Sequence, residues 1–515
     1  MAKSRTKNSA INASVATLSK IIYIIMSFVC RTFFIKTLGT EYLGVNGLFT
    51  NILTILSFAE LGIGNAIIFK LYKPIAEEDH ERIKTLLDFY KKAYFLIGSF
   101  MLVAGICVIP FLSIIIKDAP SIKENIAFIY VLFLCNTSIS YFFTYKKSII
   151  IGYQKEYIIN LINLIGTFIM NVLQIILLIT THNYVLYLVI QICWTMIENI
   201  IDAKIADKKY PYIKEKQFTK ISKQEQKNIF DDVKSLVLYK LGYILSNGTD
   251  NIIISSFLGV AQVGLLSNYN TITNAITLLL STAFNSITAS VGNLNTVKET
   301  EKKESVFYQI LLISFFVYGY ISIAITLLIN KFIVIWIGKQ YLLSFAISIA
   351  LGFNLYIDGM RYVNYTFRNT LGLFKKGRMM PLLSSFANVI LSILLVQYIG
   401  IFGVLIATGL SRLFILTWYD PYLIHKNEFK TSSVRYYKTY IYYLFITAIA
   451  FVVNYYATNM IQLQGILGFI INGIIITILT LLIYILATIK LKEFSETKER
   501  VKGIIFRKKI RKEGV

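Results

Sequence analysis

Fourteen long runs of mostly apolar residues divide this sequence, and each is long enough to cross a lipid bilayer as an α-helix. A spanning helix needs about 20 predominantly apolar residues, and it satisfies its backbone hydrogen bonds internally where no water is present. The sequence therefore predicts an all-α polytopic membrane protein. The predicted spans are 12–38, 42–69, 91–116, 125–146, 157–181, 184–205, 233–258, 262–290, 307–336, 342–367, 381–398, 401–422, 437–458 and 465–489.

The composition argues against a soluble protein. Of the 515 residues, 56% are hydrophobic and 16% are charged, whereas a soluble domain carries more charge and lacks repeated long apolar runs. The formal net charge of +24 would also suit a nucleic-acid-binding protein, but the excess lies in short loops and in the C-terminal tail. Positive residues in such loops fix the orientation of membrane helices, and we favour this interpretation.

Alternate loops differ in charge and so predict an orientation. One set holds most of the lysines and arginines, and the other set is short and nearly uncharged. The positive-inside rule places the first set and both termini on the cytoplasmic side of the cell membrane. The first apolar segment lacks a cleavage site of small residues, so we expect a retained helix rather than a signal peptide. The basic segment 498–512 is expected to lie on the anionic inner leaflet.

A stretch near the N-terminus recurs 220 positions later. Residues 39–54, GTEYLGVNGLFTNILT, correspond to residues 259–274, GVAQVGLLSNYNTITN. The same offset holds upstream and downstream of this stretch, which indicates a duplicated half. The matching pairs include Gly39 and Gly259, Gly44 and Gly264, Lys20 and Lys240, Tyr23 and Tyr243, and Gly152 and Gly372.

The duplication predicts two six-helix lobes in a parallel repeat, because an even number of spans returns the chain to the same side. The interface between such lobes is the natural place for a central site. The predicted parts are an N-terminal lobe at 1–206, a cytoplasmic linker at 207–227, a C-terminal lobe at 228–425, two extra helices within 426–490 and a basic cytoplasmic tail at 491–515.

Two predicted spans carry charged residues where charge is expensive. A Lys, Arg or Asp at the bilayer centre costs about 2.5–3.5 kcal/mol on insertion scales. In the first span, Lys20 and Arg31 are three helical turns apart and share a face with Ser27. These residues predict a cavity between the lobes that attracts an anionic group. The seventh span offers a second polar face of Lys240, Tyr243, Asn247 and Asp250.

The repeat also suggests a gate. It places Arg31 opposite the neighbour of Asp250, so these two residues are expected to pair on the outer side of the cavity. An alternative for Lys20 and Lys240 is that both side chains extend to the cytoplasmic interface and bind nothing. Asn268 either lines the cavity or forms hydrogen bonds between helices.

Other interior charges are open to two interpretations. Asp358 and Arg361 are three residues apart in span ten, so they either contact cargo and coupling ions or neutralise each other. Arg412 is a lone cation in a short apolar span and a weaker candidate. Glu198 and Asp202 are expected near cytoplasmic helix ends, where charge costs little.

Several motifs that catalysis would need are missing from the sequence. It contains no GxxxxGK[ST] phosphate-binding loop, and its outer loops carry no paired carboxylates for acid–base chemistry. The four cysteines lie in apolar runs without a CxxC, and the three histidines lie in loops or at helix ends. We therefore expect no metal, no cofactor and no enzymatic activity.

The sequence resembles the polysaccharide-transport branch of the multidrug/oligosaccharidyl-lipid/polysaccharide (MOP) exporter superfamily. The resemblance rests on four segments: the opening KIIYIIMSFVCRTFFIKTLGTEYLGVNGLF, AELGIGNAIIFKLY, IIGYQKEYI and FLGVAQVGLLSNYNTI. It implies a two-lobed, V-shaped flippase that moves undecaprenyl-diphosphate-linked oligosaccharides outward by alternating access. It also implies that cations in the first and seventh spans contact the diphosphate, a role that only Lys20, Arg31 and Lys240 fit.

Two other functions remain open from the sequence alone: a multidrug exporter of the same fold and a flippase for the peptidoglycan precursor. A third, a membrane glycosyltransferase, is disfavoured because the outer loops lack catalytic carboxylates. The expected partners are the lipid-linked oligosaccharide, membrane lipids, a polysaccharide polymerase and glycosyltransferases. A monomer is the default, because the duplication already supplies both lobes. Asp250 and Asp358 are the candidates if an ion is coupled to transport.

Overall fold

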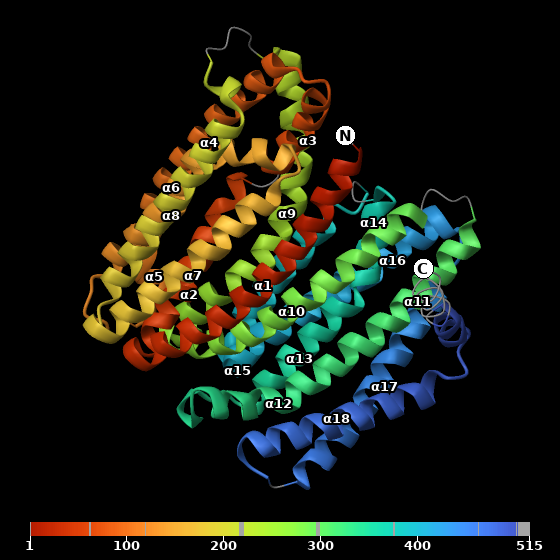
Figure 1. Ribbon diagram of the computed structural model, residues 1–515. Coiled ribbons are helices and arrows are strands. Elements are labelled where there is room, and N and C mark those ends of the chain that lie inside the picture. Colours follow the sequence, from red (N-terminus) through yellow and green to blue (C-terminus); the bar gives the residue numbers. More distant parts are fainter. Residues whose placement is uncertain are drawn as a thin grey trace, which may run out of the picture. The chain divides into compact units, whose positions relative to one another are not determined.

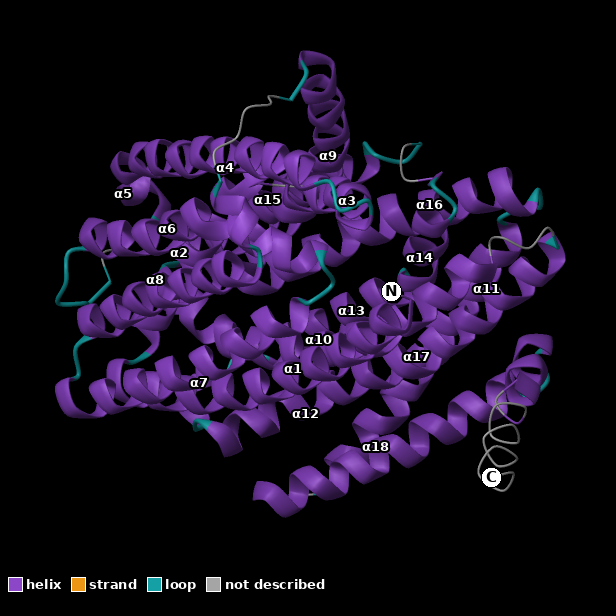
Figure 2. Cartoon of the chain, turned by 45° about the horizontal axis from the view of Figure 1, so that its top comes forward, coloured by secondary structure: helices purple, strands orange, loops and turns teal. Residues whose placement is uncertain are grey.

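The computed structural model of the chain is built almost entirely of helices (Figure 1, Figure 2). It describes residues 2–60, 63–118, 120–215, 221–294, 299–373, 376–461, 463–500 and 502, and no strand occurs within them. Within these residues, ten helical segments are long and apolar enough to cross a membrane. The all-α membrane fold is therefore confirmed, whereas the count of fourteen spans stays a prediction.

The chain separates into two compact units, Met1–Leu279 and Leu280–Val515, and the boundary falls inside helix α10. The lobe boundaries predicted at 206 and 228 follow from the duplication and not from compactness. The division into units does not test them, so they stay a prediction. In unit 1, α4, α6 and α8 pack side by side, and α1 packs along α7 (Figure 1). The helices of unit 1 are α1 (Ala2–Leu38), α2 (Thr40–Leu56), α3 (Ile63–Ala76), α4 (His80–Val108), α5 (Leu112–Ile115), α6 (Ile126–Gly152), α7 (Glu156–Thr181), α8 (Tyr184–Lys209), α9 (Lys223–Leu258) and most of α10 (Val260–Leu294).

Polar residues fix where several of these helices begin. The side chains of Asp79, Asn125, Asn183 and Ser222 each accept a hydrogen bond from the backbone N–H three residues further on. Such a cap satisfies a donor that has no partner within the helix. These four residues therefore define the starts of α4, α6, α8 and α9.

The predicted repeat is visible in the backbone. Gly39 ends α1 with φ of 90°, and Gly259, its counterpart 220 positions later, ends α9 with φ of 89°. Both angles lie in the left-handed region, which favours glycine. The α1–α2 and α9–α10 pairs therefore turn through the same unusual backbone geometry, as duplicated segments should.

The two glycine turns bring α2 and α10 into backbone contact. A Cβ atom added at Gly44 would overlap the carbonyl oxygen of Val260, and one added at Gly264 would overlap the carbonyl oxygen of Thr40. Thr40 and Val260 are themselves counterparts at the offset of 220. The contact is therefore reciprocal, as in a two-fold interface. We call this contact the glycine crossing.

Unit 2 packs its last two helices onto the others. The ring of Phe315 stacks on Tyr443 of α17 at 4.4 Å and on Tyr484 of α18 at 4.2 Å between centroids. The extra helices predicted at the C-terminus therefore share the aromatic core of this unit. The helices of unit 2 are α11 (Thr300–Ser314), α12 (Tyr320–Trp336), α13 (Phe345–Met360), α14 (Tyr362–Thr370), α15 (Met380–Ser411), α16 (Thr417–Ile424), α17 (Val434–Asn459) and α18 (Gly465–Thr488), with π-helical turns at Phe315–Gly319, Arg412–Leu416 and His425–Phe429.

Helix α15 is two antiparallel helices joined by a sharp turn. The backbone leaves helical geometry at Ile399 and Gly400, where Gly400 has φ of 58°. The Asn388 amide donates to the Thr408 hydroxyl at 2.8 Å, although 20 residues separate them. The chain therefore doubles back on itself, which agrees with the break between the predicted spans 381–398 and 401–422.

The glycine crossing predicts the effect of single methyl groups. We expect Gly44→Ala and Gly264→Ala each to lower the thermal unfolding temperature of the purified protein, because overpacking costs about 1–3 kcal/mol. Gly47→Ala is the matched control, since its Cβ would lie 3.5 Å from the nearest atom, in Val263. The control should be neutral or stabilising, because alanine favours a helix over glycine by about 1 kcal/mol. Equal stability of all three variants would contradict the close crossing.

Candidate functional site: a polar cleft along helix α1

Three adjoining cavities follow α1 within unit 1. Their volumes are about 210, 290 and 170 Å³, and Tyr23 lines all three. The first cavity lies between α1 and α7, the second also reaches α2, α8 and α10, and the third lies between α1 and α10. We call the three together the α1 cleft.

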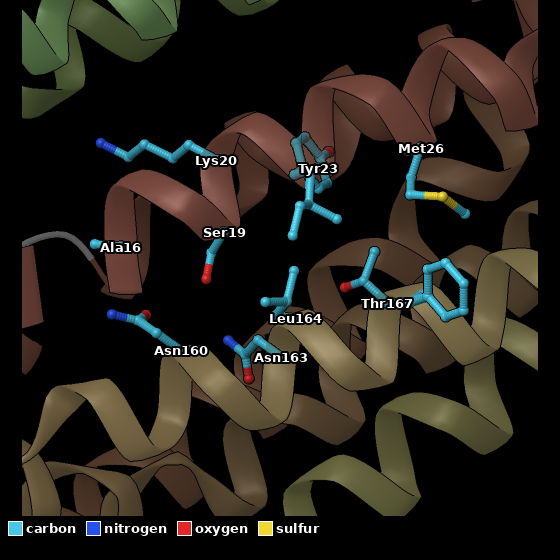
Figure 3. Close-up of a pocket in the computed structure, with 11 residues that line it drawn as sticks. Ala16, Ser19, Lys20, Tyr23, Met26, Asn160, Asn163, Leu164 and Thr167 are labelled. Atoms are coloured by element: carbon cyan, nitrogen blue, oxygen red, sulfur yellow. The ribbon is translucent and has the colours of Figure 1, made fainter. Parts of the chain in front are cut away.

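The first cavity contains Lys20, one of the predicted cations. Figure 3 shows Ser19 pointing toward α7, where Asn160 and Asn163 lie, whereas the Lys20 side chain extends along α1. Lys20 is partly buried. Most of the remaining lining is apolar: Ala16, Ile22, Met26, Leu164 and Phe168. This end of the cleft thus combines one ammonium group with an apolar wall.

The second cavity is more polar and contains Arg31. No carboxylate is among its lining residues, all of which lie in the described part of the chain. Four side-chain amides line the same cavity as the Arg31 guanidinium. Amides both donate and accept hydrogen bonds. Such a lining suits an anionic, hydroxyl-rich molecule. The polar lining besides Arg31 consists of Tyr23, Ser27, Cys30, Asn46, Thr167, Asn171, Gln174, Tyr187, Gln191 and Ser267.

Arg31 is held by neutral acceptors. Its Nε donates to Asn268 Oδ1 at 2.8 Å, and its Nη2 donates to the Ser267 hydroxyl. Asp250, the partner expected from the sequence, is not among the acceptors that this guanidinium has in the described structure. The Arg31–Asp250 gate, which we predict for the inward-open state, therefore stays a prediction. Asn268 is confirmed as a polar contact between helices.

The two halves of the repeat differ at the position of Arg31 and at that of its partner Ser267. The counterpart of Arg31 is Asn251, and the counterpart of Ser267 is Gly47. Asn251 indeed lies by Gly47, with its Nδ2 3.7 Å from where a Cβ would be. The same pair of positions thus meets on both sides of the glycine crossing. Only one side carries a charge and a hydroxyl.

One face of α7 supplies polar groups that were not predicted. The signal is present in the sequence, because these residues are spaced at three, four, four and three positions, which is one helical face. It was missed because single asparagines in a span have an ordinary explanation as hydrogen bonds between helices. The residues of this face are Asn160, Asn163, Thr167, Asn171 and Gln174.

The predicted site residues of α9 are only partly visible. Asp250 is partly buried on this helix. The side chains of Lys240, Tyr243 and Asn247 lie outside the described part of the structure. The equivalence of Lys20 and Lys240 is therefore supported by the repeat and not by side-chain positions.

Two acidic residues of α8 are more buried than expected. Asp202 is fully buried and lies 2.9 Å from Lys147 of α6, which also lies 3.7 Å from Glu198. We expected both charges near a helix end, where a charge costs little free energy. This expectation is wrong for Asp202, because protein surrounds its carboxylate and the Lys147 ammonium compensates its charge. Turning the Asn163 side-chain amide over brings its nitrogen 2.7 Å from Glu198 Oε1, where it donates a hydrogen bond to this carboxylate. In this orientation the bond positions one wall of the first cavity.

In unit 2, Asp358 lies between two arginines. Its carboxylate is 2.5 Å from Arg412 Nη1 and 3.6 Å from Arg361 Nη1. The expected Asp358–Arg361 contact is therefore present, but Arg412 is not the lone cation that the sequence suggested. Sequence spacing could not show this pair, because 54 residues separate Arg412 from Asp358.

A second buried ion pair lies in the same unit. Arg368 Nη1 and Asp420 Oδ1 are 2.7 Å apart, and their side chains are only 2% and 1% exposed. The Asp358 side chain, by contrast, is 47% exposed. The Arg368–Asp420 pair is therefore a structural contact of the core, whereas Asp358 remains accessible.

The comparisons with known proteins identify the family. A family model described as "Polysaccharide biosynthesis protein" matches residues 9–288, which is more than half of the chain. The chain belongs to the polysaccharide biosynthesis protein family. The match includes the α1 cleft and both glycine turns. No curated protein sequence matches the chain significantly.

Solved structures show the fold of this family member. A lipid II flippase, MurJ, in its inward closed conformation is 17% identical, with a TM-score of 0.64 over 93% of this chain and 99% of that chain. An inward-facing multidrug resistance MATE transporter of the MOP superfamily is 15% identical, with a TM-score of 0.60 over 81% of this chain and 99% of that chain. An outward-facing MATE transporter gives 15% and 0.52, over 80% and 93% of the two chains. The MOP-type fold expected from the sequence is confirmed.

The two ion pairs of unit 2 predict different stabilities. We expect Asp420→Asn to destabilise the protein by about 3–5 kcal/mol, because it leaves the Arg368 charge buried without its partner. Asp358→Asn should cost less, since its carboxylate is half exposed. The measurement is thermal unfolding of the purified variants. The double variant Arg368→Met/Asp420→Leu is the control, and it should recover most of the loss. A larger loss for Asp358→Asn would contradict this assignment.

Proposed function

We propose that this protein is a flippase for undecaprenyl-diphosphate-linked oligosaccharide repeat units. It would move them from the cytoplasmic to the outer leaflet, by alternating access, for the assembly of capsule, exopolysaccharide or O-antigen. The observation that carries the proposal is Arg31, a partly buried cation in a polar cavity whose lining contains no carboxylate. Membership of the polysaccharide biosynthesis protein family supports it.

The chemistry of the α1 cleft matches the parts of such a cargo. A guanidinium binds phosphate oxygens through charge-assisted hydrogen bonds, and the surrounding amides can bond sugar hydroxyls. The apolar wall beside Lys20 suits the lipid end of the molecule. Lys240 and Arg361 are the other cations that we propose to bind the diphosphate.

The membrane potential favours this direction of transport. A lipid diphosphate carries about two negative charges, and outward movement of each is favoured by about 2.3 kcal/mol per 100 mV when the inside is negative. Asp250 and Asp358 remain candidates for ion coupling. Asp358 already contacts two arginines, so Asp250 is the better candidate.

A multidrug exporter is the first alternative, because MATE transporters share the fold. A cationic drug requires carboxylates in the cavity, and the lining of the second cavity supplies an arginine and neutral groups. A flippase for the peptidoglycan precursor is the second alternative, since MurJ is a lipid II flippase with the same fold. Rescue of cells depleted of their own precursor flippase would distinguish it.

The proposal is tested by binding of a soluble undecaprenyl-diphosphate sugar analogue to the purified protein. We expect Arg31→Ala and the double variant Lys20→Ala/Lys240→Ala each to weaken binding at least about tenfold, since a hydrogen bond to a charged group contributes about 1.5–3 kcal/mol. Lys36→Ala is the matched control, because Lys36 is an exposed cation of the same helix. It should bind like the wild type.

Two results would contradict the proposal. If the wild type binds a cationic drug but not the diphosphate analogue, the multidrug alternative takes its place. If all variants bind the analogue equally, the anionic group is held elsewhere and the α1 cleft is not its site. Polymer export by cells carrying each variant, at equal protein level, gives a second readout.

A further inference from the structure

The seam between α1 and α10 differs from its symmetric counterpart between α2 and α9. We propose that Ser267 and Asn268 bind the Arg31 guanidinium until the anionic group of the cargo replaces them. The arrival of this group then releases α10 and loosens the glycine crossing. We call the two hydrogen bonds from Arg31 to Ser267 and Asn268 the latch. The proposal rests on the proposed function for the identity of the anion. The latch itself rests on the contacts described below.

The seam between α2 and α9 is closed by apolar packing. The Ile55 side chain packs against the backbone of Gly248, which has no side chain of its own. The Asn51 amide also donates a hydrogen bond to the Gly248 carbonyl at 3.5 Å. Dispersion contacts of this kind do not depend on whether an ion is present. No charged residue is among these described contacts at Gly248.

The seam between α1 and α10 is open at the equivalent place. The counterparts of Gly248, Asn51 and Ile55 are Phe28, Thr271 and Ala275. These three residues line the third cavity, of about 170 Å³. Hydrogen bonds from Arg31 to Ser267 and Asn268 bridge this seam instead. One seam thus depends on packing and the other on a charge.

The hydrogen bond from Arg31 to Asn268 is one that an anionic ligand can replace. Asn268 is fully buried, and its Nδ2 has no hydrogen-bond partner in the described structure. Leaving a buried donor without a partner is unfavourable. A phosphate or carboxylate oxygen is a stronger acceptor for a guanidinium than an amide oxygen. An anion entering the 290 Å³ cavity, which Arg31 and Ser267 both line, would therefore displace the two side chains.

The two acceptors lie close to the contact that they would control. Ser267 and Asn268 follow Gly264 by three and four residues, which is about one helical turn. A shift of α10 at Arg31 is therefore transmitted to the glycine crossing through one turn of rigid helix. Because linkage is reciprocal, a weakened crossing must also increase the affinity of Arg31 for the anion.

The test measures access to the crossing with a hydrophilic maleimide. Val263, which neighbours Gly264 and is fully buried, is replaced by Cys in a full-length protein whose native cysteines are replaced by Ala. We expect slow labelling in nanodiscs, and labelling at least about tenfold faster after addition of undecaprenyl diphosphate. Ser267→Ala/Asn268→Leu and Arg31→Ala should label fast without it. Val291→Cys, a 1% exposed position on the same helix, is the control for general unfolding and should stay slow in every variant.

Separate results decide the latch and the cargo. Slow labelling of Ser267→Ala/Asn268→Leu and of Arg31→Ala overturns the latch, whatever the cargo is. If these variants label fast and undecaprenyl diphosphate binds to the wild type without accelerating labelling, displacement by cargo is overturned while the proposed function stands. If undecaprenyl diphosphate does not bind at all, the proposed function fails, and the latch is then judged on the variants alone.

Discussion

The approach of two backbones at Gly44 and Gly264 is the constraint on which unit 1 depends. Side chains elsewhere in the unit can adjust by rotation, but a carbonyl oxygen facing a Cα hydrogen leaves no such freedom. The left-handed turns at Gly39 and Gly259 aim α2 and α10 at this point. Helices α1 and α9 are thereby fixed on the two sides of the crossing, and the α1 cleft forms along one of them.

Charges inside this protein are compensated in three different ways. Arg368 and Asp420 form a fully buried pair, in which each charge has its counter-charge. Asp358 is shared by two arginines and remains half exposed. Within the described part of the chain, the acceptors of Arg31 are the neutral side chains of Ser267 and Asn268. Because a cation in a membrane span is costly without a counter-charge, Arg31 gains most from an anionic ligand.

The sequence predicts the helical membrane fold and the repeat well, because the fold follows from apolar runs within single segments and the repeat from two segments that match at a constant offset. It also places Lys20, Ser27 and Arg31 on one helical face, and all three line the α1 cleft. It does not predict that Arg31 bonds Ser267 and Asn268, since 236 and 237 residues separate the partners. Pairing across such distances is decided by tertiary packing, which a local pattern does not contain.

Duplication alone gives a protein with two equivalent seams, and equivalent seams have no preference about which one opens. A carrier that accepts one kind of cargo needs that equivalence to be broken at the cargo's own binding group. Here the two halves differ at two positions of the repeat: Arg31 corresponds to Asn251, and Ser267 corresponds to Gly47. One half therefore carries a charge and a hydroxyl that the other lacks, while the glycine crossing keeps its two-fold form. The seam held by ion–dipole contacts is sensitive to an anion, and the seam held by packing is not. A ligand can shift such an equilibrium only through a difference in binding between the two states, and Arg31 is placed where that difference arises.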